Sequence, residues 1–236
     1  MTPSWPSLTA AQMAEVDRLM IEEYGILLIQ MMENAGRNLA EMARRMLGEQ
    51  LTGRHIVVLC GAGNNGGGGM AAACHLHNRS AVVRIKFVGD PARLTDVSAH
   101  QWRILQAMGL ANNDEPDLAR ADLIVDALIG YGLTGNAHGP VAEWIVRADT
   151  ANCVILSLDT PSGLDATTGV PGNPCIQASA TLTLALPKAG LLQLNARQFV
   201  GALYLADISV PPELYRQIGV EVGPLFTNAT IIQVHR

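Results

Sequence analysis

Three segments of the sequence combine glycines, amides and acids in a way that suits chemistry on a phosphorylated ligand. The first runs from Gly61 to Gly69 and reads GAGNNGGGG, and an apolar helical pattern follows it. Glycines allow a tight turn and let phosphate oxygens approach the backbone closely. The unpaired N–H groups at a helix N-terminus attract anions. We therefore expect a turn that opens a helix and binds a phosphate-bearing ligand.

The second segment places an acid inside an apolar strand. Asp126 lies in the sequence DLIVDAL at 122–128, and the glycine-containing stretch IGYGLTG follows at 129–135. A carboxylate in such a strand must be hydrogen-bonded, paired or coordinated to a cation, because burying it alone is costly. It either serves a cation site or caps backbone amides of the next loop.

The third segment runs from a strand directly into a rigid turn. The sequence LSLDTPSGLD at 156–165 places Asp159 at the strand end. Pro161 fixes its own φ and Gly163 frees the next step, so the Asp159 carboxylate and the Ser162 hydroxyl would be presented in a fixed geometry. The alternative role for Asp159 is that of a turn-stabilising aspartate.

The elements that must position these segments alternate along the chain. Helical periodicity predicts two helices, from Thr9 to Gly25 and from about Leu27 to Leu47, before the first strand. Apolar segments separated by stretches long enough for helices then predict parallel strands with right-handed crossovers. These segments are Ile56–Cys60, Val82–Val88, Leu123–Leu128 and Val154–Leu158. Two later β-like pieces, 180–186 and 203–208, are expected to extend the sheet at one edge.

Ligands of open parallel sheets bind beyond the carboxyl ends of the strands, and all three segments follow strands. We therefore expect them to meet in one crevice. Gly61, Gly63 and Gly66 also satisfy the pattern G-x-G-x-x-G, and Asp90 ends the next strand where a ribose-binding acid would lie. This gives a rival interpretation as a nicotinamide-dependent oxidoreductase.

Composition narrows the classes of partner. The chain has 236 residues, of which 49% are hydrophobic and 16% charged, and this suits one domain with helices on both faces of a sheet. The net charge is −5 and no run of Lys or Arg occurs, so neither nucleic acid nor membrane is an expected partner. The chain shows no leader pattern, which predicts a cytoplasmic location. The four cysteines are expected to be small buried hydrophobes.

Together these segments resemble the YjeF N-terminal domain family, the NAD(P)HX epimerases. The resemblance is carried by MENAG at 32–36, GNNGG at 63–67, VDAL at 125–128 with Gly130 and Gly132, Asp159 with PSGLD at 161–165, and PK at 187–188 with GLL at 190–192. It implies a single α/β domain over residues 1–236, a Rossmann-like three-layer sandwich with a mostly parallel central sheet and helices on both faces.

The resemblance also implies an activity. Family members interconvert the R and S epimers of hydrated NADH or NADPH, called NAD(P)HX, whose nicotinamide ring carries a hydroxyl at C6. The kinase-like dehydratase domain is absent from this chain, so the stand-alone form is implied, commonly a homodimer that works with a separate NAD(P)HX dehydratase. This role belongs to the repair of nicotinamide cofactors.

Site residues follow from the family pattern. Asp159 corresponds to the catalytic acid, which we expect to exchange protons with the C6 hydroxyl. One potassium ion per subunit is implied, with Asn65, Asp126 and Ser162 as its side-chain ligands. The residues expected to contact the dinucleotide are Asn64, Asn65, Gly66, Gly67, Gly68, Gly130, Tyr131, Gly132, Leu133, Thr134, Gly135, Asn136 and Asp159.

Two positions depart from the family pattern. Gly68 stands where the family loop has an acid, and Tyr131 stands where a small hydroxyl residue is usual. The first departure leaves open a catalytically inactive dinucleotide-binding or scaffold member of the same fold. Retention of the proposed ion ligands together with Asp159 favours the enzyme over the scaffold, and the oxidoreductase ranks third.

Overall fold

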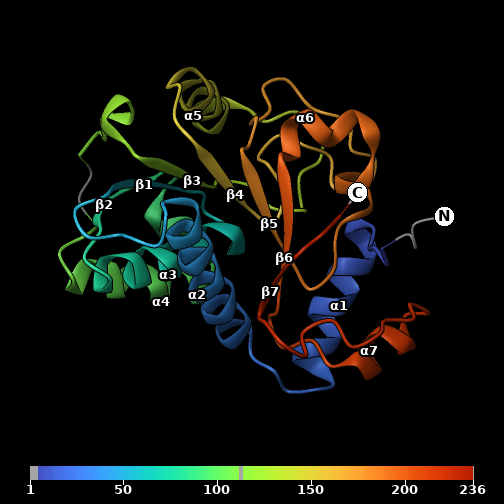
Figure 1. The fold of residues 1–236 in the computed structure, drawn as a ribbon. Helices are drawn as coiled ribbons and strands as arrows, with labels where there is room; N and C mark the ends of the chain where they lie inside the picture. The colour runs from blue at the N-terminus through green and yellow to red at the C-terminus, as the bar shows by residue number, and fades with distance from the viewer. Residues whose placement is uncertain (1–4, 112–113, 236) are drawn as a thin grey trace.

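The computed structural model describes residues 5–111 and 114–235, which build a seven-stranded sheet (Figure 1). The strands are β1 His55–Cys60, β2 Val82–Phe87, β3 Leu123–Ala127, β4 Ile155–Leu158, β5 Ala180–Leu184, β6 Ala202–Ala206 and β7 Ile231–Gln233. Their order across the sheet is β2-β1-β3-β4-β5-β6-β7. All neighbours are parallel except β6 and β7, which are antiparallel. The prediction of a mostly parallel sheet is confirmed.

Helices cover both faces of this sheet, as predicted. They are α1 Ala10–Glu22, α2 Leu28–Met46, α3 Asn64–Asn78, α4 Asp96–Ala107, α5 Gly139–Thr150, α6 Arg197–Val200 and α7 Pro212–Gln217. Figure 1 shows α2, α3 and α4 on one face and α5 on the other. α1 and α7 lie at the end of the sheet formed by β5 to β7, where they share a separate apolar cluster.

The two faces follow from alternation along the central strands. In β1, Ile56 and Val58 belong to the cluster that includes α2, α3 and α4, whereas Val57 and Leu59 pack with α5. All four are at most 3% exposed. A strand covered on both sides needs apolar residues at every position, which explains why the sequence there is continuously hydrophobic.

The glycine-rich segment is partly helical, which corrects the expectation of a turn up to Gly69. Helix α3 begins at Asn64, so Gly66 to Gly69 all lie inside it. The reason is close packing. A Cβ on Gly66 would come within 1.9 Å of the Gly61 carbonyl oxygen, and one on Gly69 within 2.6 Å of the Ala127 Cβ. These glycines therefore let the helix lie directly against β1 and β3.

α1 is fixed at its N-terminal end by contacts that bring it to the later part of the chain. Thr9 and Gln12 form the predicted capping box. The preceding residue, Leu8, donates its N–H to the Pro187 carbonyl at 3.0 Å and accepts from the Ala189 N–H at 2.8 Å. The start of α1 is thus held beside the chain that follows β5.

The prediction of four buried cysteines is correct for two. Cys60 and Cys175 are buried, whereas Cys74 on α3 and Cys153 beside the start of β4 are only partly covered. All four are free thiols, and burial raises the pKa of each. In the part of the chain that the structure describes, no helix is long and apolar enough to cross a membrane.

Candidate active site

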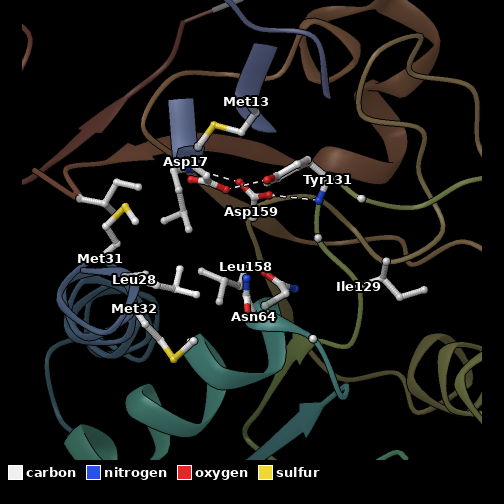
Figure 2. A pocket seen from close by; sticks show the side chains of 18 of the residues that line it. Met13, Asp17, Leu28, Met31, Met32, Asn64, Ile129, Tyr131, Leu158 and Asp159 are labelled. Carbon is white, nitrogen blue, oxygen red and sulfur yellow. Dashed lines mark hydrogen bonds between the residues drawn. The ribbon is translucent and has the colours of Figure 1, made fainter. Parts of the chain in front are cut away.

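A cavity of about 400 Å³ lies where the predicted segments meet, beyond the carboxyl ends of β1, β3 and β4. The N-terminus of α3 and the residues at the ends of β3 and β4 form part of its wall, and α1 and α2 close it from the other side. Figure 2 shows Met13 and Asp17 of α1 at one end of the pocket and Met32 and Asn64 at the opposite end. Loops far apart in sequence therefore share one crevice.

The start of α3 contributes Gly63, Asn64, Asn65 and Gly68 to the lining. Asn64 is exposed, and its Oδ1 accepts a hydrogen bond of 3.2 Å from the Thr95 hydroxyl. The first N–H groups of a helix have no partner within it, so this terminus suits an anionic group of a ligand.

Gly66 and Gly67 lie behind this wall. Gly66 packs on the Gly61 backbone, and a Cβ on Gly67 would meet the Met32 side chain at 2.5 Å. Both are buried and neither lines the pocket. Their role in the structure is to let α3 pack closely against its neighbours, rather than to line the cavity.

Gly68 differs from these two, because its α-carbon faces the cavity. A Cβ there would meet only the Cδ2 of Leu158, at 2.8 Å. Leu158 itself lines the pocket. A side chain at position 68 would therefore enter the pocket.

Asp126 is fully buried and accepts four hydrogen bonds. Its Oδ1 accepts from the Leu128 N–H at 3.2 Å and the Ser162 hydroxyl at 2.5 Å, and its Oδ2 accepts from the Ser157 hydroxyl at 2.8 Å and the Ser162 N–H at 2.9 Å. Burial raises the pKa of this carboxyl, and the Ser162 hydrogen bonds oppose the rise. Asp126 thus caps backbone amides and joins the loops after β3 and β4.

The three side chains expected to bind a cation all surround the segment 128–130. Asp126 accepts from the Leu128 N–H, and the Ser162 hydroxyl accepts from the Ile129 N–H at 2.9 Å. The Asn65 side chain lies against Gly130, where a Cβ would be 3.2 Å from its Oδ1. The Asn65 Nδ2 is buried without a hydrogen-bond partner in the described parts of the chain.

This set contains one acid only. Across residues 5–111 and 114–235, no group of three His, Cys, Asp or Glu side chains is arranged to hold a metal. An amide, a carboxylate and a hydroxyl offer oxygen ligands, which suit a hard cation rather than a transition metal.

Asp159 follows β4 with a positive φ of 67° and is 3% exposed. Its Oδ1 accepts from the Lys188 ammonium group and from the Leu184 N–H at 3.4 Å, and its Oδ2 accepts from the Tyr131 N–H at 3.2 Å. A left-handed backbone is tolerated by Asp better than by most residues. Asp159 lines the pocket, so this anchored carboxylate faces the ligand space.

Lys188 is fully buried, and sequence reasoning did not assign it a site role. Its Nζ also donates to the Leu184 carbonyl at 2.9 Å and the Thr183 hydroxyl at 3.4 Å. A buried ammonium needs such a set of acceptors, because an unpaired charge in the interior is costly. The signal was the PK pair at 187–188, but nothing in its spacing named Asp159 as the partner.

Asp17 and Tyr131 form a second polar contact at the pocket. The Tyr131 hydroxyl donates to the Asp17 Oδ2 at 2.6 Å. Burial raises the pKa of Asp17, and the hydrogen bond from Tyr131 opposes the rise. Burial chiefly raises the pKa of the Tyr131 phenol, and the neighbouring Asp17 adds to it. Asp17 was not predicted; its only sequence signal is an acid among the apolar positions Met13, Val16 and Met20 of one helix.

The segment 130–136 divides at Gly132. Gly130, Tyr131 and Gly132 line the pocket, whereas Leu133, Thr134, Gly135 and Asn136 do not. Asn136 instead accepts a hydrogen bond from the Asn173 N–H at 3.0 Å.

Asp90, the acid of the oxidoreductase interpretation, also lies off the pocket. It is exposed and accepts from the Ala92 N–H at 3.0 Å, so it caps a short 3₁₀ helix. It is absent from the pocket lining. The geometry gives no support to a ribose contact at this position.

Fold and pocket define a class: an α/β protein with a ligand site at the carboxyl ends of its parallel strands and an acid held there by a buried lysine. The chain belongs to the YjeF N-terminal family, because the family described as "YjeF-related protein N-terminus" matches residues 28–190.

Curated relatives agree with this family. A protein of Dehalogenimonas lykanthroporepellens named "NAD(P)H-hydrate epimerase" is 42% identical over 216 residues, which cover 91% of this chain and 86% of that protein. A protein of Moorella thermoacetica named "Bifunctional NAD(P)H-hydrate repair enzyme Nnr" is 39% identical, and the match covers 88% of this chain and 41% of that protein.

A solved structure supports the fold. The crystal structure of yeast ynu0, YNL200c, superposes with a TM-score of 0.84 and covers 97% of this chain and 99% of that chain, at 23% sequence identity.

Proposed function

We propose that the protein is an NAD(P)H-hydrate epimerase that interconverts the R and S forms of NAD(P)HX in nicotinamide cofactor repair. Relatives bearing that name match over most of both chains, as in Dehalogenimonas and in Weissella koreensis. The observation that carries the proposal is the Asp159 carboxylate, fixed by Lys188 and Tyr131 at the wall of a pocket that the N-terminus of α3 also lines.

The chemistry follows from what Asp159 offers. Its Oδ1 is occupied by Lys188 and Leu184, whereas its Oδ2 has one donor, the Tyr131 N–H. A carboxylate oxygen has room for a further hydrogen bond. The Asp159 Oδ2 can therefore hydrogen-bond the C6 hydroxyl of the substrate and exchange a proton with it. General acid–base help of this kind contributes about 10²–10⁴-fold in rate. The dinucleotide phosphates would lie at the start of α3, where Asn64 and Asn65 contribute to the wall.

A potassium ion, one per subunit, belongs to the same proposal. Asn65, Asp126 and Ser162 would hold it. The buried Nδ2 of Asn65 has no hydrogen-bond partner among the described residues, and turning the amide over would point its oxygen to the ion instead. When bound, the cation would compensate the Asp126 charge and fix the three loops relative to one another.

The assembly and location are part of the proposal too. We expect a cytoplasmic homodimer that supplies the S epimer to a separate NAD(P)HX dehydratase. The name of the Moorella relative joins repair functions in one longer chain, of which the matched region is 41%, and this supports such a partnership.

A coupled assay tests the proposal. R-NADHX is mixed with an S-specific dehydratase and ATP, and regenerated NADH is followed by its absorbance with and without the protein. Recovery faster than the spontaneous rate is the expected result. No acceleration, with dinucleotide binding retained in calorimetry, would identify a non-catalytic binding member instead.

A further inference from the structure

The pocket holds a second carboxyl, from Asp17 of α1, that the proposed function has not used. Its helix face is otherwise apolar, with Met13, Val16 and Met20 buried around it. A carboxyl placed on such a face loses hydration, which is a cost without a packing benefit. Groups of this kind, placed in a cleft beside a charged partner, are candidates for function.

The hydrogen bonding leaves one Asp17 oxygen for a ligand. Its Oδ2 accepts from the Tyr131 hydroxyl at 2.6 Å, the one donor that this carboxyl has among the residues described. Its side chain lines the same cavity as Asp159. Figure 2 shows Asp17, Tyr131 and Asp159 converging at one end of the pocket.

Tyr131 joins the two acids. Its N–H binds Asp159 and its hydroxyl binds Asp17, so a single residue sets both carboxyls relative to the pocket. The acids come from different elements, since Asp17 lies on α1 and Asp159 follows β4. A ligand can therefore meet each of them from a different direction.

Epimerisation at C6 creates a need for such a pair. The hydroxyl leaves one face of the ring and returns to the other. The Asp159 carboxylate is firmly held, because the ammonium of the fully buried Lys188 binds its Oδ1. A single carboxylate held in this way can exchange a proton with the hydroxyl oxygen on one face of the ring only. Two acids from separate elements can serve two positions, as pairs of carboxyls do in glycoside hydrolysis.

We propose that Asp17 is a second catalytic residue, which donates a proton to the departing oxygen while Asp159 accepts one from the returning water. This proposal rests on the proposed function. The C6–O bond breaks as the ring nitrogen lone pair forms a C6=N1 iminium, and the Asp17 proton converts the leaving oxygen to water. Water then adds to the opposite face, the electron pair returns to N1, and the released proton passes to the Asp159 carboxylate. Exchange with solvent resets both groups.

The charges around Asp17 agree with the acid role. The ionisable groups that act on it are Tyr131, Lys188 and Asp159. Burial outweighs the hydrogen bond from Tyr131 and the attraction of Lys188, so the pKa of Asp17 is raised and its proton is retained to higher pH than in water. Paired carboxyls in unlike surroundings divide acid and base roles in this way.

The decisive variant is Asp17→Asn, which keeps the shape and removes the acid. Epimerisation is measured directly by chromatographic separation of R- and S-NADHX, and NADH binding is measured by calorimetry. We expect kcat of Asp17→Asn to fall by about 10²–10⁴-fold, while its KM and its NADH binding change by less than about threefold. Asp17→Glu keeps an acid, so its kcat should be at least about tenfold higher than that of Asp17→Asn. Glu15→Gln is the matched control, because Glu15 lies on the same helix, pairs with Arg18 and is absent from the pocket lining.

A pH profile separates proton transfer from a structural role. The Tyr131 hydroxyl lowers the pKa of Asp17, so Tyr131→Phe raises it further. The alkaline fall of kcat should then move to higher pH in Tyr131→Phe and be absent from Asp17→Asn. A wild-type protein that epimerises while Asp17→Asn keeps a kcat within threefold overturns this inference alone, and so does an unmoved profile. A wild-type protein without epimerase activity overturns the proposed function with it.

Discussion

Two aspartates at the ends of neighbouring strands solve the problem of a buried charge in opposite ways. Asp126 accepts hydrogen bonds from two hydroxyls and two backbone N–H groups, which come from β4 and from the loops that follow β3 and β4. Asp159 is anchored mainly through one oxygen, by the Lys188 ammonium, and its other oxygen has a single N–H donor beside the cavity. A carboxylate that accepts four hydrogen bonds within the protein supports the loops, whereas one with fewer donors at a cavity can act on a ligand.

The largest effect should come from Asp159→Asn, which tests whether the carboxylate of Asp159 takes part in the reaction. We expect kcat for epimerisation to fall by about 10²–10⁴-fold. The folded content is checked by circular dichroism, because the change leaves Lys188 without its counter-charge. The double variant Asp159→Asn with Lys188→Met removes both charges and should unfold at a higher temperature than the single variant, while remaining inactive. Full activity in either variant would remove Asp159 from the chemistry.

Lys188→Met should reduce stability strongly, since it leaves the Asp159 charge buried without its partner. Breaking a buried pair from one side costs about 3–5 kcal/mol in the free energy of unfolding. Urea denaturation measures this loss, and Lys86→Met is the control because the Lys86 ammonium is only loosely paired, 3.7 Å from Glu115. Equal losses in the two variants would contradict a special role for the buried pair.

Asp126→Asn should cost less, about 1–3 kcal/mol, because one of two backbone N–H donors would then face an amide NH₂. Ser157→Ala removes a single hydroxyl donor and should cost less again. Both are measured by urea denaturation. Epimerase activity at saturating substrate should persist in the folded fraction of each, in contrast to Asp159→Asn.

Asp126 also predicts a pH dependence of stability. Its pKa is raised by burial, so the folded state holds this proton at a pH where the unfolded state has released it. Stability from this group is therefore greatest below the unfolded-state pKa and is lost as pH rises through the folded-state pKa. The asparagine variant should lack this part of the decline in urea midpoint between acidic and neutral pH. An identical slope in both proteins would show that hydrogen bonds cancel the effect of burial.

Gly68→Asp has the smallest expected effect and tests whether the pocket accepts the acid that the family resemblance implies at this position. Its Cβ would displace only the Leu158 Cδ2, the far end of a flexible side chain, so the fold should persist. A hydrogen bond from a ribose hydroxyl to the new carboxylate would tighten NADH binding by about tenfold. Gly223→Asp adds the same charge at an open position and serves as control. Unchanged affinity in calorimetry would exclude position 68 from ligand contact.

The sequence predicted the half of the site that follows strands. Asn65, Asp126 and Ser162 meet around segment 128–130, and Asp159 lies at the cavity, because carboxyl ends of parallel strands share one edge. The alternating apolar segments likewise predicted a mostly parallel sheet, which the strand order confirms. The cation and the catalytic role of Asp159 stay predictions.

The other half depends on where α1 packs, and periodicity does not encode that. Asp17 reaches the pocket because α1 packs in an apolar cluster with later parts of the chain and because Leu8 pairs with the chain around Lys188. Glycine content also misled: Gly66 to Gly69 suggested a turn, yet tight packing against β1 and β3 makes them helical. Both failures come from contacts distant in sequence that override local preference.

The attachment of Leu8 to Pro187 and Ala189 has a consequence for how the molecule is divided. The family match begins at residue 28, after α1 has ended at Glu22. A shortened chain starting there would keep every strand of the sheet and lose one wall of the ligand chamber. Loosening of the first helix alone would likewise open the chamber to water.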